Sequence, residues 1–288
     1  MNQSSTQFEK HINIDDSDKP IIDYLAENTS LSRQKLKQVM VKGAVWLSHG
    51  KKTQRIRRAK KKARSGDTLH IYYDEQVIER QPPVPELVTD EGSYSVWYKP
   101  YGMLSQGSRW GDHCTVTRWA EQHLSPQRPA FVVHRLDRAA TGLILVAHEK
   151  KSAAALSALF QSRDIDKQYR AIVHGKFPDI NKTINSDIDD RSAITHIHLL
   201  EYDENINRSL LEVKIETGRK HQIRRHLSEA GFPIVGDRLY GDSKKNSERE
   251  DLQLTAFTLA FQCPVTGIQR DYQLNKDKLP QLSSLIKP

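Results

Sequence analysis

The sequence predicts an α+β fold divided between a small amino-terminal domain and a larger carboxy-terminal domain. The chain has 288 residues, enough for one sizeable hydrophobic core and a smaller second one. A stiff proline-rich segment with Pro82, Pro83 and Pro85 separates the two parts. Beyond it, strand-like and helix-like segments mix without strict βαβ alternation. This order favours a curved, mostly antiparallel mixed sheet.

The expected division of the chain follows from composition. Residues 1–18 are polar and aperiodic, so we expect them to be disordered. Residues 19–80 are expected to form the small α/β domain, and residues 81–92 a proline-rich linker. Residues 93–288 then form the larger domain.

Within the small domain, residues 19–43 show the periodicity of helices. The polar residues at 29–32 break that pattern and offer caps for a second helix. Short strands are expected at 44–47 and 68–72, with a turn at 65–67.

Basic residues are concentrated in one short region. The window 33–64 holds thirteen Lys and Arg residues and no Asp or Glu. Since the whole chain has a net charge of +8, the remainder carries −5. Such a run is usually a solvated face or a flexible arm. In a folded domain, however, it is typical of proteins that bind polyanions.

In the larger domain, residues 95–98 are expected to form a strand and residues 151–160 an amphipathic helix. Between them lies His134-Arg135-Leu136-Asp137-Arg138, followed by an apolar, strand-like segment. Flanking arginines favour the ionised form of the Asp137 carboxylate. Spacing alone is compatible with two functions, a structural ion pair or a catalytic carboxylate.

This motif, followed by Thr141-Gly142-Leu143, resembles the catalytic motif of the RluA-type pseudouridine synthases, which isomerise uridine in RNA. Other segments resemble the same family in the same order. They are Lys99-Pro100-Tyr101-Gly102, Lys167-Gln168-Tyr169, Thr217 to His226, and Gly236-Asp237-Arg238-Leu239-Tyr240-Gly241. The resemblance implies the pseudouridine synthase fold, a uridine substrate in RNA and no cofactor.

The family's essential aspartate corresponds to Asp137. It either attacks the sugar covalently or deprotonates it to give a glycal-like intermediate, and the sequence does not choose between them. The family's active-site tyrosine corresponds to Tyr169, expected to stack on the flipped uracil and to act as a general base. Arg224 is expected to pair with Asp137. Arg135 would fill the space that the flipped base leaves.

Further substrate contacts are expected from His134, Arg219 and His221. Gly218 suits a tight turn that places Arg219 at a helix amino terminus, where phosphate binds well. On that helix we expect Gln222, Arg225 and His226 to share a face. We assign Lys99 no chemistry and expect the 236–241 loop to be structural.

The small domain resembles the alpha-L RNA-binding module, found in a ribosomal protein and many RNA-modifying enzymes. The matching residues are Ser32-Arg33, Lys42-Gly43-Ala44-Val45, Gly50 and Gly66-Asp67. The resemblance implies RNA contacts, which we place on the basic side chains Arg33, Lys35, Arg57 and Arg58. Family members with this module act more often on ribosomal than on transfer RNA, so ribosomal RNA is the preferred substrate.

Other functions receive less support. His221 and His226 are five residues apart, which does not suit a helical zinc pair, so we expect no metal. Two cysteines without a CxxC pattern, no apolar span and no signal-like start favour a cytoplasmic protein, expected to be a monomer. A transfer-RNA synthase or a non-catalytic RNA-folding factor remains an alternative. A glycosidase or nuclease would need a second suitably placed carboxylate.

Overall fold

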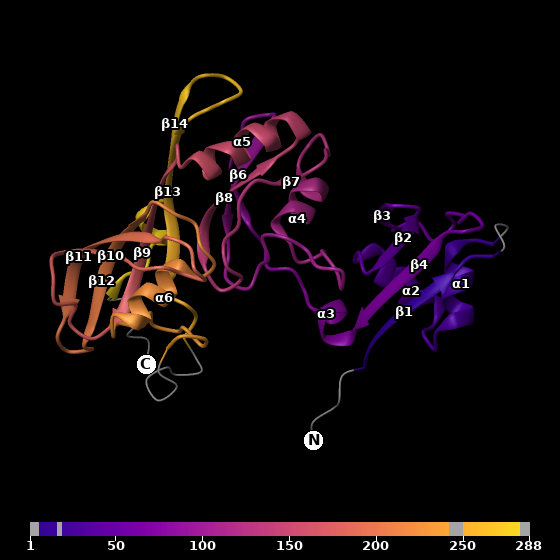
Figure 1. Cartoon of the computed structure of the whole chain (residues 1–288), viewed down its shortest axis with the longest axis horizontal. Helices are drawn as coiled ribbons and strands as arrows, with labels where there is room; N and C mark the ends of the chain where they lie inside the picture. Colours follow the sequence, from indigo (N-terminus) through magenta and orange to yellow (C-terminus); the bar gives the residue numbers. More distant parts are fainter. Residues whose placement is uncertain (1–5, 16–18, 242–249, 283–288) are drawn as a thin grey trace. The chain divides into compact units, whose positions relative to one another are not determined.

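The computed structural model describes residues 6–15, 19–241 and 250–282. The chain forms two compact units, the first made of residues 1–82 and 106–119, the second of 83–105 and 120–288 (Figure 1). The sequence-based division assigned residues 106–119 to the larger domain. The structure instead packs them with the first unit.

The first unit is a four-stranded antiparallel sheet with helices on one side. The strands lie in the order β1–β4–β2–β3. Their bounds are Gln7–Asn13 for β1, Val45–His49 for β2, Lys52–Arg55 for β3 and Thr68–Asp74 for β4. The helices are α1 (Ile21–Asn28), α2 (Arg33–Val41) and the short α3 (Glu75–Glu79). The helices and strands predicted within 19–72 are thus confirmed.

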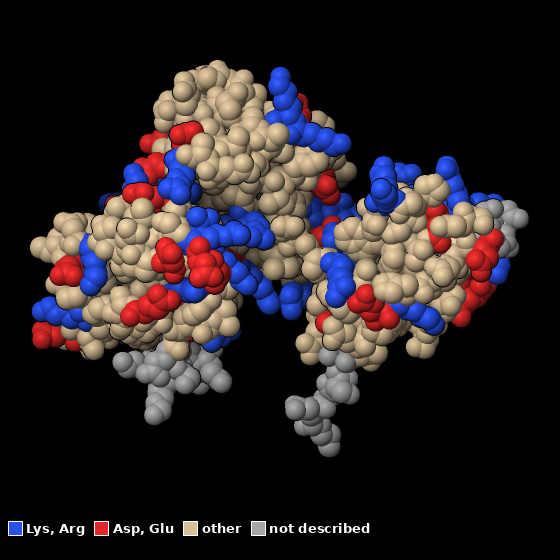
Figure 2. Space-filling model, viewed as in Figure 1, with Lys and Arg blue, Asp and Glu red and all other residues tan. Residues whose placement is uncertain are grey.

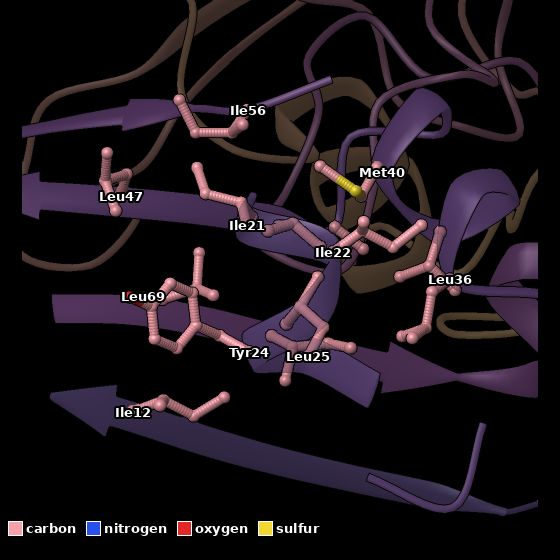
Figure 3. Packing of buried hydrophobic residues seen from close by; sticks show 14 of the residues in the cluster. Ile12, Ile21, Ile22, Tyr24, Leu25, Leu36, Met40, Leu47, Ile56 and Leu69 are labelled. Atoms are coloured by element: carbon pink, nitrogen blue, oxygen red, sulfur yellow. The ribbon is translucent and has the colours of Figure 1, made fainter. Parts of the chain in front are cut away.

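Apolar side chains of α1 and α2 pack onto this sheet. Ile21 and Leu25 of α1 meet Leu36 of α2 and Leu69 of β4 in one core (Figure 3). The Ser32 hydroxyl accepts a hydrogen bond from the Lys35 N–H at 3.2 Å and so caps α2. The sheet therefore has one covered face and one open face.

The first strand corrects an expectation. Residues 7–13 form β1, which pairs with β4 from Gln7–Asp74 to Asn13–Thr68, so the expected disorder of residues 1–18 is wrong for this segment. Its inward residues Phe8 and Ile12 pack against the core. Only two apolar residues lie among polar ones, and a local pattern that weak predicts no strand without its partner. Residues 1–5 and 16–18 lie outside the described residues.

The basic stretch 51–64 is anchored to the fold. The N–H of Ile21 donates to the Lys61 carbonyl at 2.8 Å, and the buried Asp67 carboxylate accepts the Arg64 N–H at 2.9 Å. These bonds hold the backbone against the start of α1 and the turn before β4. The stretch is therefore a folded surface segment, which excludes the flexible arm considered from the sequence.

The second unit is built on a mixed sheet of ten strands within the described residues. The path runs β10–β11–β12–β9–β13–β8–β6–β5, and β14 and β7 pair with β13 and β8. The strands are β5 (Glu86–Asp90), β6 (Tyr94–Lys99), β7 (Phe131–Val132), β8 (Thr141–Ala147), β9 (Asp166–His174), β10 (Asn181–Asn185), β11 (Ile194–Asp203), β12 (Arg208–Ile215), β13 (Leu254–Gln262) and β14 (Gln269–Gln273). Among these pairings only that of β13 with β8 is parallel. The predicted α+β class with a mostly antiparallel mixed sheet is confirmed.

Three helices and a short 3-10 turn complete the described part of this chain. They are α4 (Val116–His123), α5 (Lys150–Ser162), α6 (Gln222–Glu229) and the turn Lys276–Lys278. Helix α5 contains the predicted 151–160 helix and lies against β8, while α6 lies against β11 in the other half of the sheet (Figure 1). Strand β5 pairs with β6, so residues 86–90 of the expected linker 81–92 belong to the sheet. Over the described residues, no helix combines the length and apolar character that crossing a membrane requires.

Candidate active site

The loop between β7 and β8 carries the 134–138 motif to the edge of a pocket in the second unit. Segments far apart in sequence line this pocket, including strand β9, the end of β12 and helix α6. The lining residues are Arg135, Leu136, Asp137, Ala140, Tyr169, Ile215, Gly218, Arg219, His221, Gln222, Ile223, Arg224 and Leu254. The three residues predicted to be catalytic thus share one cavity with three of the four substrate contacts predicted in the second unit, Arg135, Arg219 and His221.

Asp137 meets two basic side chains at the pocket wall. Arg224 Nη1 donates to Asp137 Oδ2 at 3.1 Å, and His221 Nε2 lies 3.6 Å from Asp137 Oδ1. Burial lowers the pKa of His221 and the Asp137 charge opposes that shift only in part, so the imidazole is neutral at neutral pH. The Asp137 side chain is 25% exposed, which leaves part of the carboxylate accessible to a ligand.

Arg224 is held from behind by a buried second carboxylate. Its Nε and Nη2 donate to the two oxygens of Asp237 at 2.8 and 2.7 Å, the geometry of a bidentate pair. Burial would lower the pKa of Arg224, but its bonds to Asp237 and Asp137 raise it above the usual value. Burial would raise the pKa of Asp237, but Arg224 and two backbone N–H groups lower it. Both groups therefore stay charged and fix the guanidinium that faces Asp137.

Two buried side chains fix the backbone on either side of Asp137. The Ser105 hydroxyl donates to the Leu136 carbonyl at 2.8 Å and accepts the Leu136 N–H at 3.0 Å. Lys99 Nζ donates to the carbonyls of Ala140 at 2.6 Å and Met103 at 3.0 Å. Burial lowers the pKa of Lys99 to about 7, although the Asp137 charge opposes the shift. Lys99, to which the sequence assigned no chemistry, thus supports the loop that bears Asp137.

The glycine of the Thr141-Gly142 pair is required by the sheet. Gly142 has a φ of +114°, and a Cβ there would lie 2.1 Å from the Ala256 carbonyl oxygen. This is the point where β8 runs parallel to β13, and Thr141 Oγ1 lies 2.7 Å from Thr255 Oγ1. A side chain at 142 would push β13 away from the strand that follows Asp137.

Tyr169 reaches the pocket from β9. Burial raises the pKa of its phenol, and the Asp137 charge adds to the rise. The ring is therefore in its protonated form at neutral pH. The ring can stack and the phenol can donate a hydrogen bond. The phenol can accept a proton only if it gives its own proton to another group.

One face of helix α6 was expected to hold Gln222, Arg225 and His226, and the structure places only two of them there. Gln222 and His226 share a buried face, since Gln222 Nε2 and His226 Nδ1 lie 3.0 and 2.9 Å from Thr195 Oγ1. Arg225 does not join them. It points outward and pairs with the exposed Asp189 at 2.9 Å. Placing Arg225 on that face was wrong because a charged side chain stays in water unless a partner is buried with it.

The predicted turn before α6 is also different. Gly218 has no positive φ, and the left-handed residue at the start of the helix is His221, with a φ of 56°. Arg219 lies outside the first turn, where its Nε donates to the Ser192 carbonyl at 3.1 Å. The Gln222 side chain caps the turn by accepting the Arg219 N–H at 3.1 Å. Arg219 therefore lines the pocket without occupying the helix amino terminus.

His134 does not reach the pocket. Its ring stacks on Phe160 with centroids 4.2 Å apart, and its Nε2 accepts the Leu145 N–H at 3.0 Å. Burial and the nearby Lys167 charge lower the pKa of His134 to about 3. The neutral ring packs against α5 and is not part of the pocket lining, so a substrate contact from His134 stays a prediction. Arg135, in contrast, is exposed at the pocket rim.

The basic residues chosen in the first unit fall into two groups. Arg33 pairs with Asp23, Lys35 pairs with Glu79 at 3.1 Å, and Arg57 pairs with Asp112. Arg58 is exposed. The fold therefore supplies acidic partners that the window 33–64 lacks in sequence, and Arg57 serves mainly to hold the 106–119 segment.

Sequence reasoning missed Asp237, Ser105 and the role of Lys99. One signal for Asp237 was available in the sequence. Its carboxylate lies in a Gly-Asp loop shortly after the arginine-rich segment that contains Arg224, which made it a candidate ionic partner. Across the described residues, no cluster of three or more His, Cys, Asp or Glu side chains is arranged to hold a metal ion.

The known proteins that this chain resembles are RNA pseudouridine synthases. The family model for RNA pseudouridylate synthase matches residues 93–229. The ribosomal large subunit pseudouridine synthase D of Zymomonas mobilis is 30% identical over 292 residues, covering 90% of this chain and 89% of that protein. The tRNA pseudouridine synthase C of Pectobacterium carotovorum is 35% identical over 167 residues, covering 48% and 44%.

A solved structure shares the fold. Human RNA pseudouridylate synthase domain containing 1 superposes with a TM-score of 0.59 at 23% identity, covering 70% of this chain and 88% of that one.

Proposed function

The chain belongs to the RNA pseudouridylate synthase family, and from this premise we propose that it isomerises uridine in structured ribosomal RNA through the carboxylate of Asp137. The observation that carries the proposal is the contact of Asp137 with the buried Arg224 inside a pocket that Tyr169 also lines. Activity as an RNA pseudouridine synthase follows from the family. The RNA target and the roles of individual residues are the proposal.

The reaction replaces one bond of the nucleoside by another. The bond between N1 of uracil and C1′ of ribose breaks, the base turns, and C5 forms a bond to C1′. C5 then loses a proton and N1 gains one, so the product is an isomer. Asp137 assists the first step, either by attacking C1′ or by removing a sugar proton, and both routes need an ionised carboxylate. The contact with Arg224 holds the carboxylate at the pocket wall.

The remaining pocket residues position the base. Tyr169 provides a ring on which the flipped uracil can stack, and its phenol can donate a hydrogen bond. If the C5 proton passes to Tyr169, the phenol must release its own proton at the same time, because burial keeps it protonated. Arg135 at the rim is suited to fill the gap left in the RNA stack.

Ribosomal RNA is favoured over transfer RNA by the extent of the similarities. The match to the ribosomal large subunit enzyme extends over 90% of the chain, whereas the match to the tRNA enzyme covers 48%. The longer match must include part of the first unit. We therefore propose that the first unit is an alpha-L-type RNA-binding domain that contributes to the choice of a ribosomal substrate.

The exposed basic residues support this role. Lys and Arg side chains project from several places on the surface of the first unit, with acidic side chains between them (Figure 2). Those exposed in its basic stretch are Lys51, Lys52, Arg58, Lys60, Lys61, Lys62 and Arg64. Such a group attracts the phosphate backbone without reading its sequence.

Catalysis is tested by comparing the wild-type protein with Asp137→Ala on bulk cellular RNA. Pseudouridine is scored by its stable carbodiimide adduct. We expect a signal from the wild-type protein and none from Asp137→Ala, whereas Asp189→Ala, which removes an exposed carboxylate paired with Arg225, should be as active as wild type. Equal signals from wild type and Asp137→Ala would defeat the proposed role of Asp137.

The RNA target is tested in cells. Pseudouridine positions are mapped in a strain that lacks the gene and in its parent. Loss of one or more sites from ribosomal RNA supports the proposal, and loss confined to transfer RNA refutes the choice of ribosomal RNA.

A further inference from the structure

The face of the first unit's sheet that α1 and α2 leave open carries aromatic rings and guanidinium groups. We call it the open sheet face. Its members are His11 of β1, Trp46 of β2, Arg55 of β3, His70 and Tyr72 of β4, and Arg109 and Trp110 of the 106–119 segment. The rings of Trp46, His70, Tyr72 and Trp110 are partly exposed. None of these residues belongs to the pocket of Asp137.

Strand register brings these side chains together. Trp46 pairs with His70, His70 with His11, and Trp46 with Arg55, so one residue from each of the four strands lies in a row. Along β4, Leu69, Ile71 and Tyr73 point into the core, so His70 and Tyr72 point to the open side. The row of side chains therefore follows from the register of the four strands and from the alternation of side chains along each strand.

The guanidinium groups lie over the rings. The Arg55 guanidinium carbon is 4.3 Å from the Trp46 ring centre, and that of Arg109 is 5.2 Å from Tyr72 and 5.6 Å from Trp110. The Trp46 indole N–H donates to the Arg109 carbonyl at 3.0 Å, which fixes the ring. Rigid rings of this kind lose little conformational freedom when a ligand binds.

The open sheet face is hollowed at its centre. Trp46, His70 and Tyr72 line a shallow cavity together with Ser48, Thr53 and Arg109. Ser48 Oγ lies 2.8 Å from His70 Nε2, and His11 Nδ1 lies 2.7 Å from His70 Nδ1. Burial lowers the pKa of His70, and the adjacent His11 lowers it further. The floor of the cavity therefore combines flat rings with uncharged polar groups.

The excess of positive charge beside the cavity comes from the basic stretch 51–64, because each arginine over the rings is paired with a carboxylate. Two arginines lie over the rings, and the carboxylates in contact with them are Glu9, 3.5 Å from Arg109, and Asp112, paired with Arg55. The basic stretch 51–64 begins at the same edge, since it includes β3. Aromatic rings beside guanidinium groups form the usual platform for the bases and phosphates of single-stranded nucleic acid.

We propose that the open sheet face binds about two or three unpaired nucleotides of the RNA substrate by stacking their bases on Trp46 and Tyr72. The proposal rests on the RNA substrate proposed above and adds a second contact, distant in sequence from the catalytic motif. Unpaired bases fit because they present a free ring face to an aromatic side chain. A duplex presents phosphates and groove edges instead.

The test measures binding of a fluorescein-labelled twelve-nucleotide RNA of adenosine and cytidine by the full-length protein, using fluorescence anisotropy. We expect Trp46→Ala and Tyr72→Ala each to weaken binding by about 5- to 150-fold, the range for losing one stacked base. Trp46→Phe and Tyr72→Phe keep a ring and should stay within about twofold of wild type. Annealing the probe to complementary DNA should weaken wild-type binding.

Tyr202→Ala is the matched control. Tyr202 is a partly exposed tyrosine of the second unit with Lys176 over its ring at 5.4 Å, so its removal tests whether any surface tyrosine near a cation has the same effect. We expect unchanged binding. The Trp46→Ala and Tyr72→Ala variants should retain the wild-type salt dependence, because stacking releases no counterions. Wild-type affinity in both alanine variants overturns the proposal, as does an equal loss in the phenylalanine variants.

A second measurement needs no substitution. The same RNA with 5-iodocytidine in place of cytidine is photo-crosslinked to the wild-type protein, and the modified peptides are identified by mass spectrometry. Crosslinks on the peptides of Trp46 or Tyr72 support the proposal, and crosslinks found only elsewhere refute it. Since the probe contains no uridine, this outcome is independent of whether Asp137 catalyses isomerisation.

Discussion

The two units place their charges in opposite environments. In the second unit, Arg224 is 4% exposed and lies between the carboxylates of Asp137 and Asp237. In the first unit, Lys60, Lys61 and Lys62 are exposed. Buried, paired charges have one geometry and a large energetic effect if a partner is lost. Exposed charges are not held in one geometry, and salt screens their interactions.

This contrast assigns different work to the two regions. The chemistry proposed for Asp137 needs a fixed contact, and the series Asp137–Arg224–Asp237 supplies one. Attraction of a large polyanion does not need fixed side chains, and an anchored backbone with mobile lysine heads is sufficient. Substitutions in the two regions should therefore differ in size and in kind.

The largest effect is expected for Asp237→Ala. It leaves Arg224 buried with only Asp137 as an ionic partner, and breaking a buried pair in this way costs about 3–5 kcal/mol of stability. Because Arg224 is no longer held from behind, activity should also fall to the level of Asp137→Ala. Chemical denaturation followed by circular dichroism measures the first quantity, and carbodiimide scoring of RNA measures the second.

The control for this variant is Asp189→Ala, which also removes a carboxylate from an arginine of α6. Asp189 is 71% exposed, so its loss should leave stability close to that of the wild-type protein. Similar losses of stability in Asp237→Ala and Asp189→Ala would mean that the buried pair of Arg224 contributes no more than the exposed pair of Arg225. The contrast drawn between buried and exposed charges would then be wrong.

Tyr169→Phe should have the next largest effect. The ring proposed to stack on uracil is kept, while the hydroxyl proposed to transfer a proton is lost. We expect kcat to fall by about 10²- to 10⁴-fold and KM to change little. A rise in KM at unchanged kcat would show that the hydroxyl binds RNA and takes no part in proton transfer.

Much of the site was predictable because its residues lie in recognisable segments. Asp137, Tyr169 and Arg224 were each identified from the sequence, and the fold brings them to one pocket. The pairing of Arg224 with Asp237 was not, although only thirteen residues separate them. Both groups are hydrophilic, and the sequence does not indicate that both are buried at the back of a pocket.

The places where the structure differs from expectation have physical causes of the same kind. His134 stands in a charged motif, yet a neighbouring helix supplies Phe160, and stacking makes the histidine part of the core. Strand β1 has a weak apolar pattern, yet β4 offers it a full ladder of backbone hydrogen bonds. In both cases a partner distant in sequence determines the structure, and local patterns contain no information about it.

Lys99 is a buried lysine, and it can be compared with the exposed lysines of the first unit. Its pKa is about 7 in the folded protein, whereas an unfolded lysine has a pKa of about 10.4. Between these values the unfolded chain carries a proton that the folded protein has released, so the stability of wild type rises with pH. The slope is at most about 1.4 kcal/mol per pH unit.

Lys99→Met removes this titration. The stability of wild type relative to Lys99→Met should therefore increase as the pH rises from about 7 to about 10, measured by denaturation at several pH values. As a control, Lys62→Met makes the same substitution at an exposed lysine, so it separates the effect of burial from that of replacing lysine by methionine. A constant difference for Lys99→Met would show that Lys99 stays charged in the fold.

The smallest effect per residue is expected in the exposed basic stretch. Replacing Lys60, Lys61 and Lys62 together by glutamine removes three charges that each neutralise at most one phosphate. The slope of log affinity against log salt should become shallower by up to about 2 units, at about 0.7 per contact with single-stranded RNA. Affinity should fall at low salt and approach that of wild type at high salt, while kcat on saturating RNA stays unchanged.

This result would separate the first unit's two modes of RNA contact. The lysine variant changes the salt slope, whereas Tyr72→Ala should lower affinity at every salt concentration by the same factor. If the lysine variant keeps the wild-type slope, the stretch 51–64 does not contact phosphate, and the arginines of the open sheet face must supply the electrostatic part of binding. If both variants change the slope of log affinity against log salt equally, the basic stretch and the open sheet face bind the RNA as one surface. The first unit then has a single mode of contact.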